Sequence, residues 1–486
     1  MGLSTGNFKI LFLQGGAVPQ LGIMILSGVL KEHGFSTDVL SLDIENDNIL
    51  ENILELTPEV VACSVMTPEF YQFKDVLASV KRRRPETFVV VGGAHPTFFP
   101  DIIFTEDSID AICIGEGEYA LLELVTSLRK RVLDVNIKNL WVKQNGKIIK
   151  NEVRDLIQDL DSLPYHDRDV FSKRYPSRGK GIAKVMMSRG CPYNCSYCYN
   201  KGMREIYSGK GSWLRHYSSE RVIEELKDVK RKYPLKWVAF MDDTFNSNKK
   251  RLNEFLKLYK KEVDIPFICQ LRVDAADEGQ IELLKQSGIE RISIGIEHGD
   301  EEYRKRVLYK KVTNKQLCKF GEWVKKRKIR LFTFNILGFP DETLDMVFST
   351  IEINSKMQPE LAVTNFLTPY PGTDIYEYAK NLDALSDDFD FSKFEGNNDP
   401  DYNSKGRLNK IEIKNPNMQK IVSLRCFFML LVWYPWLKPF VKLLIYVPHN
   451  PIYEIIWRIT GTYRIYWKYA EGAEKREYFK RMFLLK

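Results

Sequence analysis

The sequence predicts an α/β protein made of a doubly wound parallel sheet, a partial barrel of six strand and helix pairs, and a mainly helical C-terminal region. Short β-branched runs alternate with amphipathic helical stretches up to about residue 130, which is typical of a parallel sheet covered on both faces. This alternation stops in a polar segment, resumes from residue 183 and ends before a tail rich in aromatic and basic residues. These three observations divide the chain into residues 1–147, a linker at 148–180, a barrel at 181–395 and a C-terminal region at 396–486.

The composition is that of a folded, mostly soluble protein. A chain of 486 residues is too long for a single core, and 44% hydrophobic against 28% charged residues excludes a disordered or fibrous protein. Eight cysteines, three of them between residues 191 and 198, do not fit a secreted disulfide framework and indicate a reducing compartment and a metal. No targeting signal is visible, so we expect a cytoplasmic protein.

The C-terminal tail carries the positive charge. From residue 401 onward, 16 Lys and Arg stand against 6 Asp and Glu, in a chain whose net charge is +8. The longest uncharged apolar run there, Cys426–Leu437, is shorter than the roughly 20 residues that a membrane-spanning helix needs. Basic residues mixed with tryptophan suit an anionic lipid surface, so we expect peripheral contact with the inner face of the membrane. The alternative is a helical cap packed on the barrel. The tryptophans of this tail are Trp433, Trp436, Trp457 and Trp467.

The first domain is expected to bind a ligand at one edge of its sheet. Its candidate strands cover residues 8–14, 59–66, 87–92 and 109–114, and Leu21–Lys31 is one of the helices between them. Ligands of doubly wound sheets bind where the carboxyl ends of the strands meet. The four loops at that edge read LQGGAVP, SVMTPE, GGAHPT and GEGE, and three of them contain Gly, which allows close approach of the backbone.

Three cysteines follow the first barrel strand: Cys191, Cys195 and Cys198 in SRGCPYNCSYCYN. Structural zinc normally takes four ligands, and His166 and His216 lie well outside this loop. A cubane iron–sulfur cluster that is held by only three cysteines leaves one iron open to a substrate or cofactor. The six candidate barrel strands lie near residues 183–188, 236–242, 267–272, 291–297, 330–337 and 361–367.

The CxxxCxxC spacing, with Tyr197 before the last cysteine and a parallel barrel around it, resembles the radical S-adenosylmethionine (SAM) superfamily. The resemblance implies that the open iron of a 4Fe-4S cluster chelates the amine and carboxylate of SAM. One electron from the cluster then cleaves SAM to a 5′-deoxyadenosyl radical, which abstracts hydrogen from the substrate. An electron donor of the flavodoxin or ferredoxin type is therefore an implied partner.

The resemblance also implies positions for SAM along the barrel. Asp242 and Asp243 in MDDTFN stand where the family holds the SAM amine, and helix capping by Asp243 or Thr244 is compatible with this role. Arg272 would meet the SAM carboxylate by a bidentate contact, the alternative being an ordinary salt bridge. Glu297 matches a position on the ribose side, and Asn335–Pro340 matches the strand beneath the adenine. The implied SAM contacts are Tyr197, Asp242, Asp243, Arg272, Glu297, Asn335 and Gly338.

The motif TPYPGT at Thr368–Thr373 recurs in the branch of the superfamily that carries an N-terminal cobalamin domain, and PQLG, GGAHPT and GEGE make residues 1–147 look like that Rossmann-like domain. The first loop lacks the DxHxxG sequence whose His would ligate cobalt, and His95 is expected to form hydrogen bonds instead. The alternative is a flavodoxin-like module that holds no cofactor. The implied cobalamin contacts are Gln14, Gly15, Gly16, Ser64, Thr67, Gly92, Gly93, His95, Thr97, Gly115, Glu116 and Gly117.

The expected function is methyl transfer to an unactivated carbon, with methylcobalamin as the methyl source, because most of this branch is thought to do that. The apolar tail from about residue 401 predicts an apolar or lipid-like substrate. Carbon–carbon bond formation or ring formation without methylation is the alternative within enzymes. A non-catalytic iron–sulfur or cobalamin sensor at a membrane is the alternative outside them. No nucleic-acid partner is expected. The remaining cysteines, including Cys426 in the tail, are most simply small buried hydrophobic residues.

Overall fold

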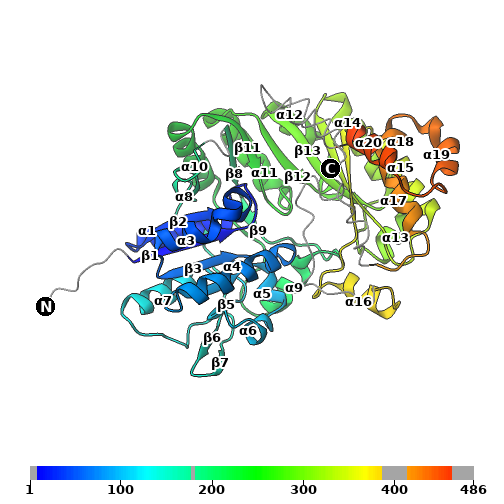
Figure 1. Ribbon diagram of the computed structural model, residues 1–486. Helices are drawn as coiled ribbons and strands as arrows, with labels where there is room; N and C mark the ends of the chain where they lie inside the picture. The colour runs from blue at the N-terminus through cyan, green and yellow to red at the C-terminus, as the bar shows by residue number, and fades with distance from the viewer. Residues whose placement is uncertain (1–7, 177–180, 386–412, 462–486) are drawn as a thin grey trace. The chain divides into compact units, whose positions relative to one another are not determined.

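The computed structural model describes residues 8–176, 181–385 and 413–461 (Figure 1). The chain forms two compact units. One is built from Met1–Val185 with Met203–Leu235, and the other from Met186–Gly202, Lys236–Phe389 and the C-terminal residues. Residues 386–412, which span the predicted boundary between the barrel and the C-terminal region, and Trp467 lie outside the described residues.

The first unit contains a seven-stranded sheet in the order β2–β1–β3–β4–β5–β6–β7. The predicted parallel pairing is confirmed for β1 to β5, whereas β6 and β7 form an antiparallel hairpin. Its turn consists of Asn145 and Gly146, both with positive φ (51° and 73°), as expected of this dipeptide in a tight hairpin. The strands are β1 Lys9–Gln14, β2 Ser36–Ser41, β3 Val60–Ser64, β4 Phe88–Gly92, β5 Ala111–Cys113, β6 Leu140–Gln144 and β7 Lys147–Lys150.

Helices cover both faces of this sheet. Successive residues of a strand point to opposite faces, so each strand contributes side chains to the apolar clusters on both sides. In β1, Ile10 and Phe12 pack in one apolar cluster with residues of α1 (Leu21–Glu32) and α7 (Glu118–Arg129). Leu11 and Leu13 pack in a second cluster with residues of α3 (Ile49–Leu56) and α4 (Phe70–Arg83). The near-continuous apolar composition of β1 is therefore explained by burial on both sides.

The segment after the hairpin, predicted as a linker, packs onto the first unit. It contains a short 3₁₀ turn, η3 (Leu160–Ser162), and one helical turn, α8 (Asp169–Ser172). Phe171 and Tyr175 belong to the apolar cluster beneath α1, and the Tyr175 hydroxyl accepts from the Ser41 amide at 2.9 Å and donates to Glu45 at 2.7 Å. Because most of this segment is polar, the sequence did not predict that Phe171 and Tyr175 pack in an apolar cluster of the first unit.

The partial barrel is a six-stranded sheet in the order β15–β14–β13–β12–β11–β8. Its pairs from β11 to β15 are parallel, and β8 and β15 are the edge strands, so the barrel is open as predicted. The strands are β8 Gly181–Val185, β11 Leu235–Phe240, β12 Phe267–Leu271, β13 Ile289–Glu297, β14 Arg330–Leu337 and β15 Leu361–Phe366. The main helices between them are α10 Ser219–Lys232, α11 Lys249–Glu262, α12 Glu278–Gln286, α14 Asn314–Lys326 and α15 Leu344–Met357.

The described C-terminal residues form short helices that pack beside α15 (Figure 1, orange to red). Leu424, Phe428 and Leu431 share an apolar cluster with residues of β14, α15 and β15. No helix among the described residues is both long and apolar enough to cross a bilayer. The helices are α17 Met418–Cys426, α18 Phe428–Trp433, the 3₁₀ turn η7 Pro435–Leu437, α19 Lys438–Leu444 and α20 Pro451–Thr460.

Candidate functional site

The three-cysteine loop runs from the short strand β9 (Ser188–Arg189) to the helix α9 (Tyr199–Ile206). Gly190, with φ of +87°, turns the chain out of β9 into the loop, a conformation that favours glycine. A hydrogen-bonding side chain stands beside each thiol, which suits sulfur atoms that carry negative charge. Cys191 Sγ lies 3.3 Å from Thr244 Oγ1, Cys195 Sγ accepts from Arg272 Nη1 at 3.3 Å, and Cys198 Sγ accepts from Asn200 Nδ2 at 3.6 Å.

Burial raises the pKa of two of these thiols, Cys191 and Cys198. It raises the pKa of Cys191, with a hydrogen bond from Thr244 opposing the shift, and it raises the pKa of Cys198 to about 11. Negative charge on Asp243 and on Cys195 raises the pKa of Cys191 and of Cys198 further. Since metal ligation requires thiolates, cluster loading releases protons and is favoured by rising pH.

Asp242 and Asp243, the predicted amine ligands, have different surroundings. Asp242 is 1% exposed, and its carboxylate accepts from the Met187 amide at 3.1 Å and from the Ser188 hydroxyl at 2.5 Å. Burial raises the pKa of Asp242 to about 6. Asp243 is exposed and accepts from the Tyr199 hydroxyl at 3.4 Å. Asp242 thus anchors the backbone ahead of the cysteine loop, and Asp243 is the carboxylate open to a ligand.

Arg272 already has a bidentate partner. Its Nε and Nη2 donate to the two carboxylate oxygens of Asp274 at 2.9 Å each, and its guanidinium lies 3.6 Å from the ring centroid of Tyr193. The remaining Nη1 faces Cys195. The salt bridge that the sequence left as the alternative is therefore present, and the SAM carboxylate stays a predicted partner of this side chain.

Glu297 ends β13 in a strained conformation. Its φ is +68°, at an irregularity in the pairing of β13 with β14, and its side chain is buried. Oε1 accepts from the Tyr197 hydroxyl at 3.1 Å and from Lys310 Nζ at 3.0 Å, which joins the cysteine loop to β13. Gly295 makes room, since a Cβ atom there would lie 1.8 Å from Glu297 Oε1.

Replacing Glu297 with Gln is expected to weaken SAM binding by roughly 10- to 100-fold, because hydrogen bonds to charged groups contribute about 1.5–3 kcal/mol. Equilibrium dialysis of SAM against the anaerobic, cluster-loaded protein measures this. Glu290→Gln is the matched control, since Glu290 lies on the same strand but its side chain is 41% exposed and pairs with Arg330. Unchanged SAM affinity in folded Glu297→Gln contradicts a SAM contact at this position.

The strand predicted beneath the adenine is β14. The Asn335 side chain is buried and bonds to the Val363 carbonyl and to Asn354 of α15, so its amide group already has partners within the protein. Gly338 has a φ of +80°, and a Cβ there would lie 3.1 Å from the Met418 side chain. Gly372 of TPYPGT also has a positive φ, +76°, as a turn requires.

Sequence reasoning missed Lys310 and Thr244. Lys310 is 5% exposed and holds both the Glu297 carboxylate and the Gly295 carbonyl. It stands in an ordinary basic run, KKVT, and no motif distinguishes it. Thr244 is in the MDDTFN motif, which predicts only a helix cap at this position and not the contact with Cys191.

The predicted cobalamin loops meet at the carboxyl edge of the parallel strands β1, β3, β4 and β5. Gly93 has a φ of +98°, and a Cβ there would lie 2.7 Å from the Val65 amide nitrogen, so only glycine fits. Thr97 Oγ1 donates to the Gly93 carbonyl at 2.7 Å and accepts from the Gly115 amide at 3.0 Å, which ties two loops together. Gly115 has a φ of +77° and faces Tyr207, whose hydroxyl a Cβ would approach to 2.0 Å.

The other loop residues have structural partners too. Gln14 is buried and its amide donates to the Gly16 carbonyl at 2.5 Å, which braces the loop after β1. The Glu116 carboxylate is held by Arg215 at 2.8 and 3.0 Å. Ser64 ends β3 and pairs with Gly92 of β4, Gly15 lies against Glu69, and Gly117 caps α7.

His95 is 3% exposed and lies between two phenylalanine rings, with centroids 4.2 Å from Phe70 and 5.0 Å from Phe99. Its Nδ1 lies 3.3 Å from Thr67 Oγ1, and its Nε2 has no hydrogen-bond partner among the described residues. The expectation that His95 does not ligate cobalt stays a prediction.

Burial lowers the pKa of His95 to about 4, so the ring is neutral at pH 7. Below the ordinary histidine pKa of about 6.5, the unfolded chain binds a proton that the folded chain does not. We therefore expect the first unit to lose about 3 kcal/mol of stability as pH falls from 6.5 to 4. Urea unfolding at several pH values measures this slope. The slope should decrease in His95→Asn and persist in His33→Asn, which changes an exposed histidine; an equal slope in both variants contradicts the assignment.

Two family models match the chain: the B12 binding domain over residues 12–125, and the radical SAM superfamily over residues 185–353. The uncharacterized methyltransferase PH0819 of Pyrococcus horikoshii is 34% identical over 370 residues, which cover 75% of this chain and 79% of the relative. The chain belongs to the radical SAM superfamily, in the group that carries a B12-binding domain, as the cysteine spacing and the four loops predicted.

Other relatives are more distant. The anaerobic magnesium-protoporphyrin IX monomethyl ester cyclase of Rubrivivax gelatinosus is 26% identical over 78% of this chain and 69% of the relative. The hopanoid C-3 methylase of Methylococcus capsulatus is 24% identical over 73% of this chain and 67% of the relative.

Two solved structures share the fold. The cobalamin-dependent radical enzyme OxsB, with aqua-cobalamin and SAM bound, has a TM-score of 0.71 at 17% identity and covers 98% of this chain and 70% of its own. The radical SAM methyltransferase TsrM of Kitasatospora setae, with cobalamin and a 4Fe-4S cluster bound, has a TM-score of 0.62 at 17% identity and covers 77% of this chain and 75% of its own.

The residues of this chain fit the three cofactors of its class: a 4Fe-4S cluster, SAM and cobalamin. The three cysteines stand in one loop with a hydrogen-bonding side chain beside each sulfur, and three thiolates suit a cluster with one open iron. At the edge of the first sheet, the loops that follow the parallel strands β1, β3, β4 and β5 meet, which is where ligands of such sheets bind. His95 Nε2 is buried there without a hydrogen-bond partner among the described residues, so a polar group of a cofactor would satisfy it. The protein is therefore a cobalamin-dependent radical SAM enzyme.

Proposed function

We propose that this enzyme transfers a methyl group to an unactivated carbon of an apolar or lipid-like substrate. When bound, SAM and cobalamin supply a hydrogen-abstracting radical and a methyl group. The observation that carries the proposal is the three-cysteine loop in a chain with a B12-binding domain, and the relative named as a methyltransferase supports it. An electron donor of the flavodoxin or ferredoxin type would complete the system.

In this proposal, different parts of the chain bind the cluster, SAM and cobalamin. Cys191, Cys195 and Cys198 hold the cluster, with charge relieved by the hydrogen bonds to their sulfurs. Asp243 would bind the SAM ammonium, since its carboxylate is exposed while that of Asp242 is occupied. Glu297 would accept from the ribose hydroxyls. The four loops of the first unit would hold cobalamin through backbone and short side chains.

The mass of the product tests methyl transfer. We expect a strain carrying the gene to contain a metabolite or lipid that is one CH₂ heavier than its counterpart in a strain lacking the gene. The extra group should carry the label when the cells receive methyl-labelled methionine. An altered compound without the added CH₂ contradicts methyl transfer.

Ring formation or carbon–carbon bond formation is the second candidate, and the cyclase relative favours it specifically. When the new bond closes a ring within one substrate molecule, the product differs from the substrate by loss of hydrogen, without any gain of carbon. The same comparison of strains therefore separates the two reactions. A sensor without catalysis should produce neither the heavier compound nor the compound that has lost hydrogen.

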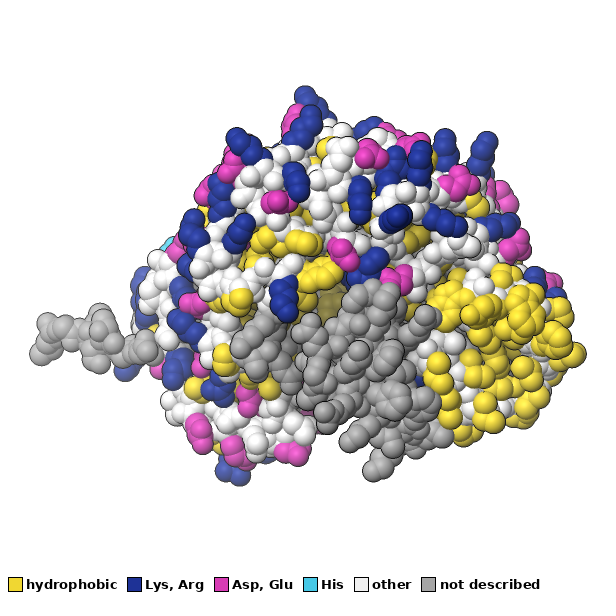
Figure 2. Space-filling model, turned by 90° about the horizontal axis from the view of Figure 1, so that it is seen from above, with side chains coloured by type: hydrophobic (Ala, Val, Ile, Leu, Met, Phe, Trp, Pro, Cys, Tyr) yellow, Lys and Arg dark blue, Asp and Glu magenta, His cyan; other side chains and the backbone are white. Residues whose placement is uncertain are grey.

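An apolar surface on the C-terminal helices supports the lipid-like substrate and contact with an anionic membrane. Figure 2 shows it as a continuous group of hydrophobic side chains at the right of the molecule. Exposed apolar groups of this extent usually mark an interaction site. Lys438 and Lys442 of α19 lie within the same stretch. The surface consists of Tyr434, Trp436, Phe440, Leu443, Leu444, Tyr446, Val447, Ile452 and Ile459, each at least 40% exposed.

Co-sedimentation with vesicles tests the membrane contact. We expect binding to vesicles of mixed phosphatidylserine and phosphatidylcholine that weakens as salt rises, since each Lys or Arg near an anionic surface contributes about 1 kcal/mol. Phe440→Ser with Leu443→Ser should abolish it, whereas Phe104→Ser, which changes an exposed residue of the first unit, should not. Equal, negligible binding of the unaltered protein to anionic and neutral vesicles contradicts membrane contact, and concentration-dependent dimers would instead assign the surface to a second copy.

A further inference from the structure

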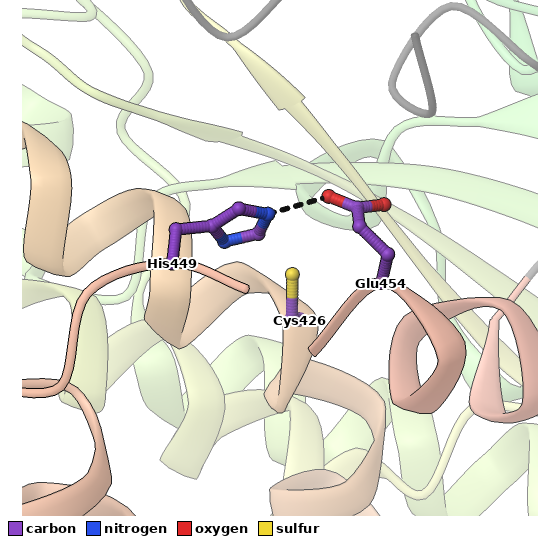
Figure 3. A group of neighbouring side chains, drawn as sticks. All are labelled: Cys426, His449 and Glu454. Carbon is purple, nitrogen blue, oxygen red and sulfur yellow. Dashed lines mark hydrogen bonds and ion pairs between the residues drawn. The ribbon is translucent and has the colours of Figure 1, made fainter. Parts of the chain in front are cut away.

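Three potential metal ligands meet in the C-terminal helices, outside the site described above. Cys426 is the last residue of α17, His449 lies in the loop before α20, and Glu454 is in the first turn of α20. Figure 3 shows the imidazole and the carboxylate facing each other above the Cys426 sulfur. One ligand atom from each residue lies within 4.8 Å of the other two.

The contacts within this group leave ligand positions unused. His449 Nε2 and Glu454 Oε1 are 2.8 Å apart, and Cys426 Sγ has a long contact of 3.7 Å with the Val422 carbonyl. His449 Nδ1 and Glu454 Oε2 are both buried without a hydrogen-bond partner among the described residues. Cys426 is 3% exposed, and the His449 and Glu454 side chains are 22% and 12% exposed. Unpaired buried polar atoms are costly, and a cation bound by this group would satisfy a ligand atom of the imidazole or of the carboxylate.

The donor set selects the kind of ion. A thiolate is a poor ligand for magnesium or calcium, whereas sulfur, imidazole nitrogen and carboxylate oxygen together are typical ligands of zinc. A divalent ion bound by one thiolate and one carboxylate is neutral overall, which suits a buried position. Three protein ligands leave a fourth position for water.

We propose that Cys426, His449 and Glu454 bind one divalent ion of the zinc class. Binding requires the Cys426 thiol to release its proton to solvent, and no electron is transferred. The ion would join the end of α17 to the start of α20 and close the loop that contains α18, η7 and α19. This loop carries most of the exposed apolar surface, so the ion would fix its shape.

Zinc binding to the full chain tests the proposal, provided that the cluster cysteines cannot take up the metal. The suitable parent is the cluster-free variant Cys191→Ala, Cys195→Ala, Cys198→Ala, without a histidine tag. Competition with a chromophoric chelator should reveal one zinc per chain. Cobalt(II) in the same site should show a thiolate-to-cobalt charge-transfer band that Cys426→Ser removes.

Single substitutions in this parent locate the site. We expect Cys426→Ser, His449→Gln and Glu454→Gln each to lower zinc affinity by at least about 10- to 100-fold. Cys318→Ser and Glu352→Gln, on α14 and α15, are matched controls that should change nothing. Glu454→Gln is nearly isosteric, so its circular dichroism spectrum should stay that of the parent even if Cys426→Ser fails to fold. The proposal is overturned if the parent binds no zinc, or if His449→Gln and Glu454→Gln bind it as tightly as the parent.

Discussion

The triple replacement Cys191→Ala, Cys195→Ala, Cys198→Ala is expected to abolish both iron binding and SAM cleavage. The unaltered protein, reconstituted without oxygen, should hold about four iron and four sulfide. Three ligands are already the minimum for such a cluster, and the other five cysteines lie elsewhere: Cys63, Cys113, Cys269 and Cys426 are buried and Cys318 is half-buried. Iron and sulfide analysis, with 5′-deoxyadenosine measured after reduction by dithionite, gives the result.

Cys318→Ala is the control for this experiment, because it removes one thiol from α14 without touching the loop. It should keep full iron content and full SAM cleavage. Retention of four iron by the triple variant would overturn the assignment of the cluster to these cysteines.

The substitution Gly93→Ala is expected to abolish cobalamin binding and to destabilise the first unit by about 2–4 kcal/mol. A residue at φ of +98° costs about 1–2 kcal/mol when it carries a Cβ. The Cβ would also lie 2.7 and 2.8 Å from backbone atoms of Val65, which cannot move without shifting β3. Gel filtration with detection of cobalamin absorbance, together with urea unfolding, measures both effects.

Substitutions of two further glycines separate the cost of the backbone conformation from the cost of the collision with Val65. A Cβ at Gly16 meets nothing within 4 Å and its φ is not positive, so Gly16→Ala should leave stability unchanged. Gly146 has a positive φ of 73° but open space around it, so Gly146→Ala should show the cost of the backbone conformation alone. Normal cobalamin binding by Gly93→Ala would mean that the cofactor does not approach this loop.

The sequence predicted the strands that are buried on both faces, because their apolar runs are continuous. β1, β3, β4 and the barrel strands from β11 to β15 all appear near the expected residues. β2 was missed since STDVLS is polar in its first half and is only partly buried there. The hairpin β6–β7 was not predicted either. Its turn has the Asn-Gly signal, but its strands are only partly apolar and lie at the edge of the sheet.

The sequence predicted which residues belong to the site but not which residues they contact. The motifs identify Asp242, Arg272 and Glu297, but the partners of Asp242 and Glu297 come from pairings that no local pattern contains. Asp242 accepts from the Met187 amide and the Ser188 hydroxyl ahead of the cysteine loop, 55 and 54 positions away, and Glu297 pairs with Lys310. Only the fold decides that Asp242 is occupied while Asp243 stays open.

The most direct test of the central claim is the fate of SAM on the fully loaded protein. With cluster, cobalamin, SAM and dithionite present and oxygen excluded, the account predicts that 5′-deoxyadenosine forms and that none forms when dithionite or the cluster is omitted. Liquid chromatography with mass spectrometry quantifies it. A protein that binds four iron and one cobalamin but leaves SAM intact would contradict the enzyme and support a sensor.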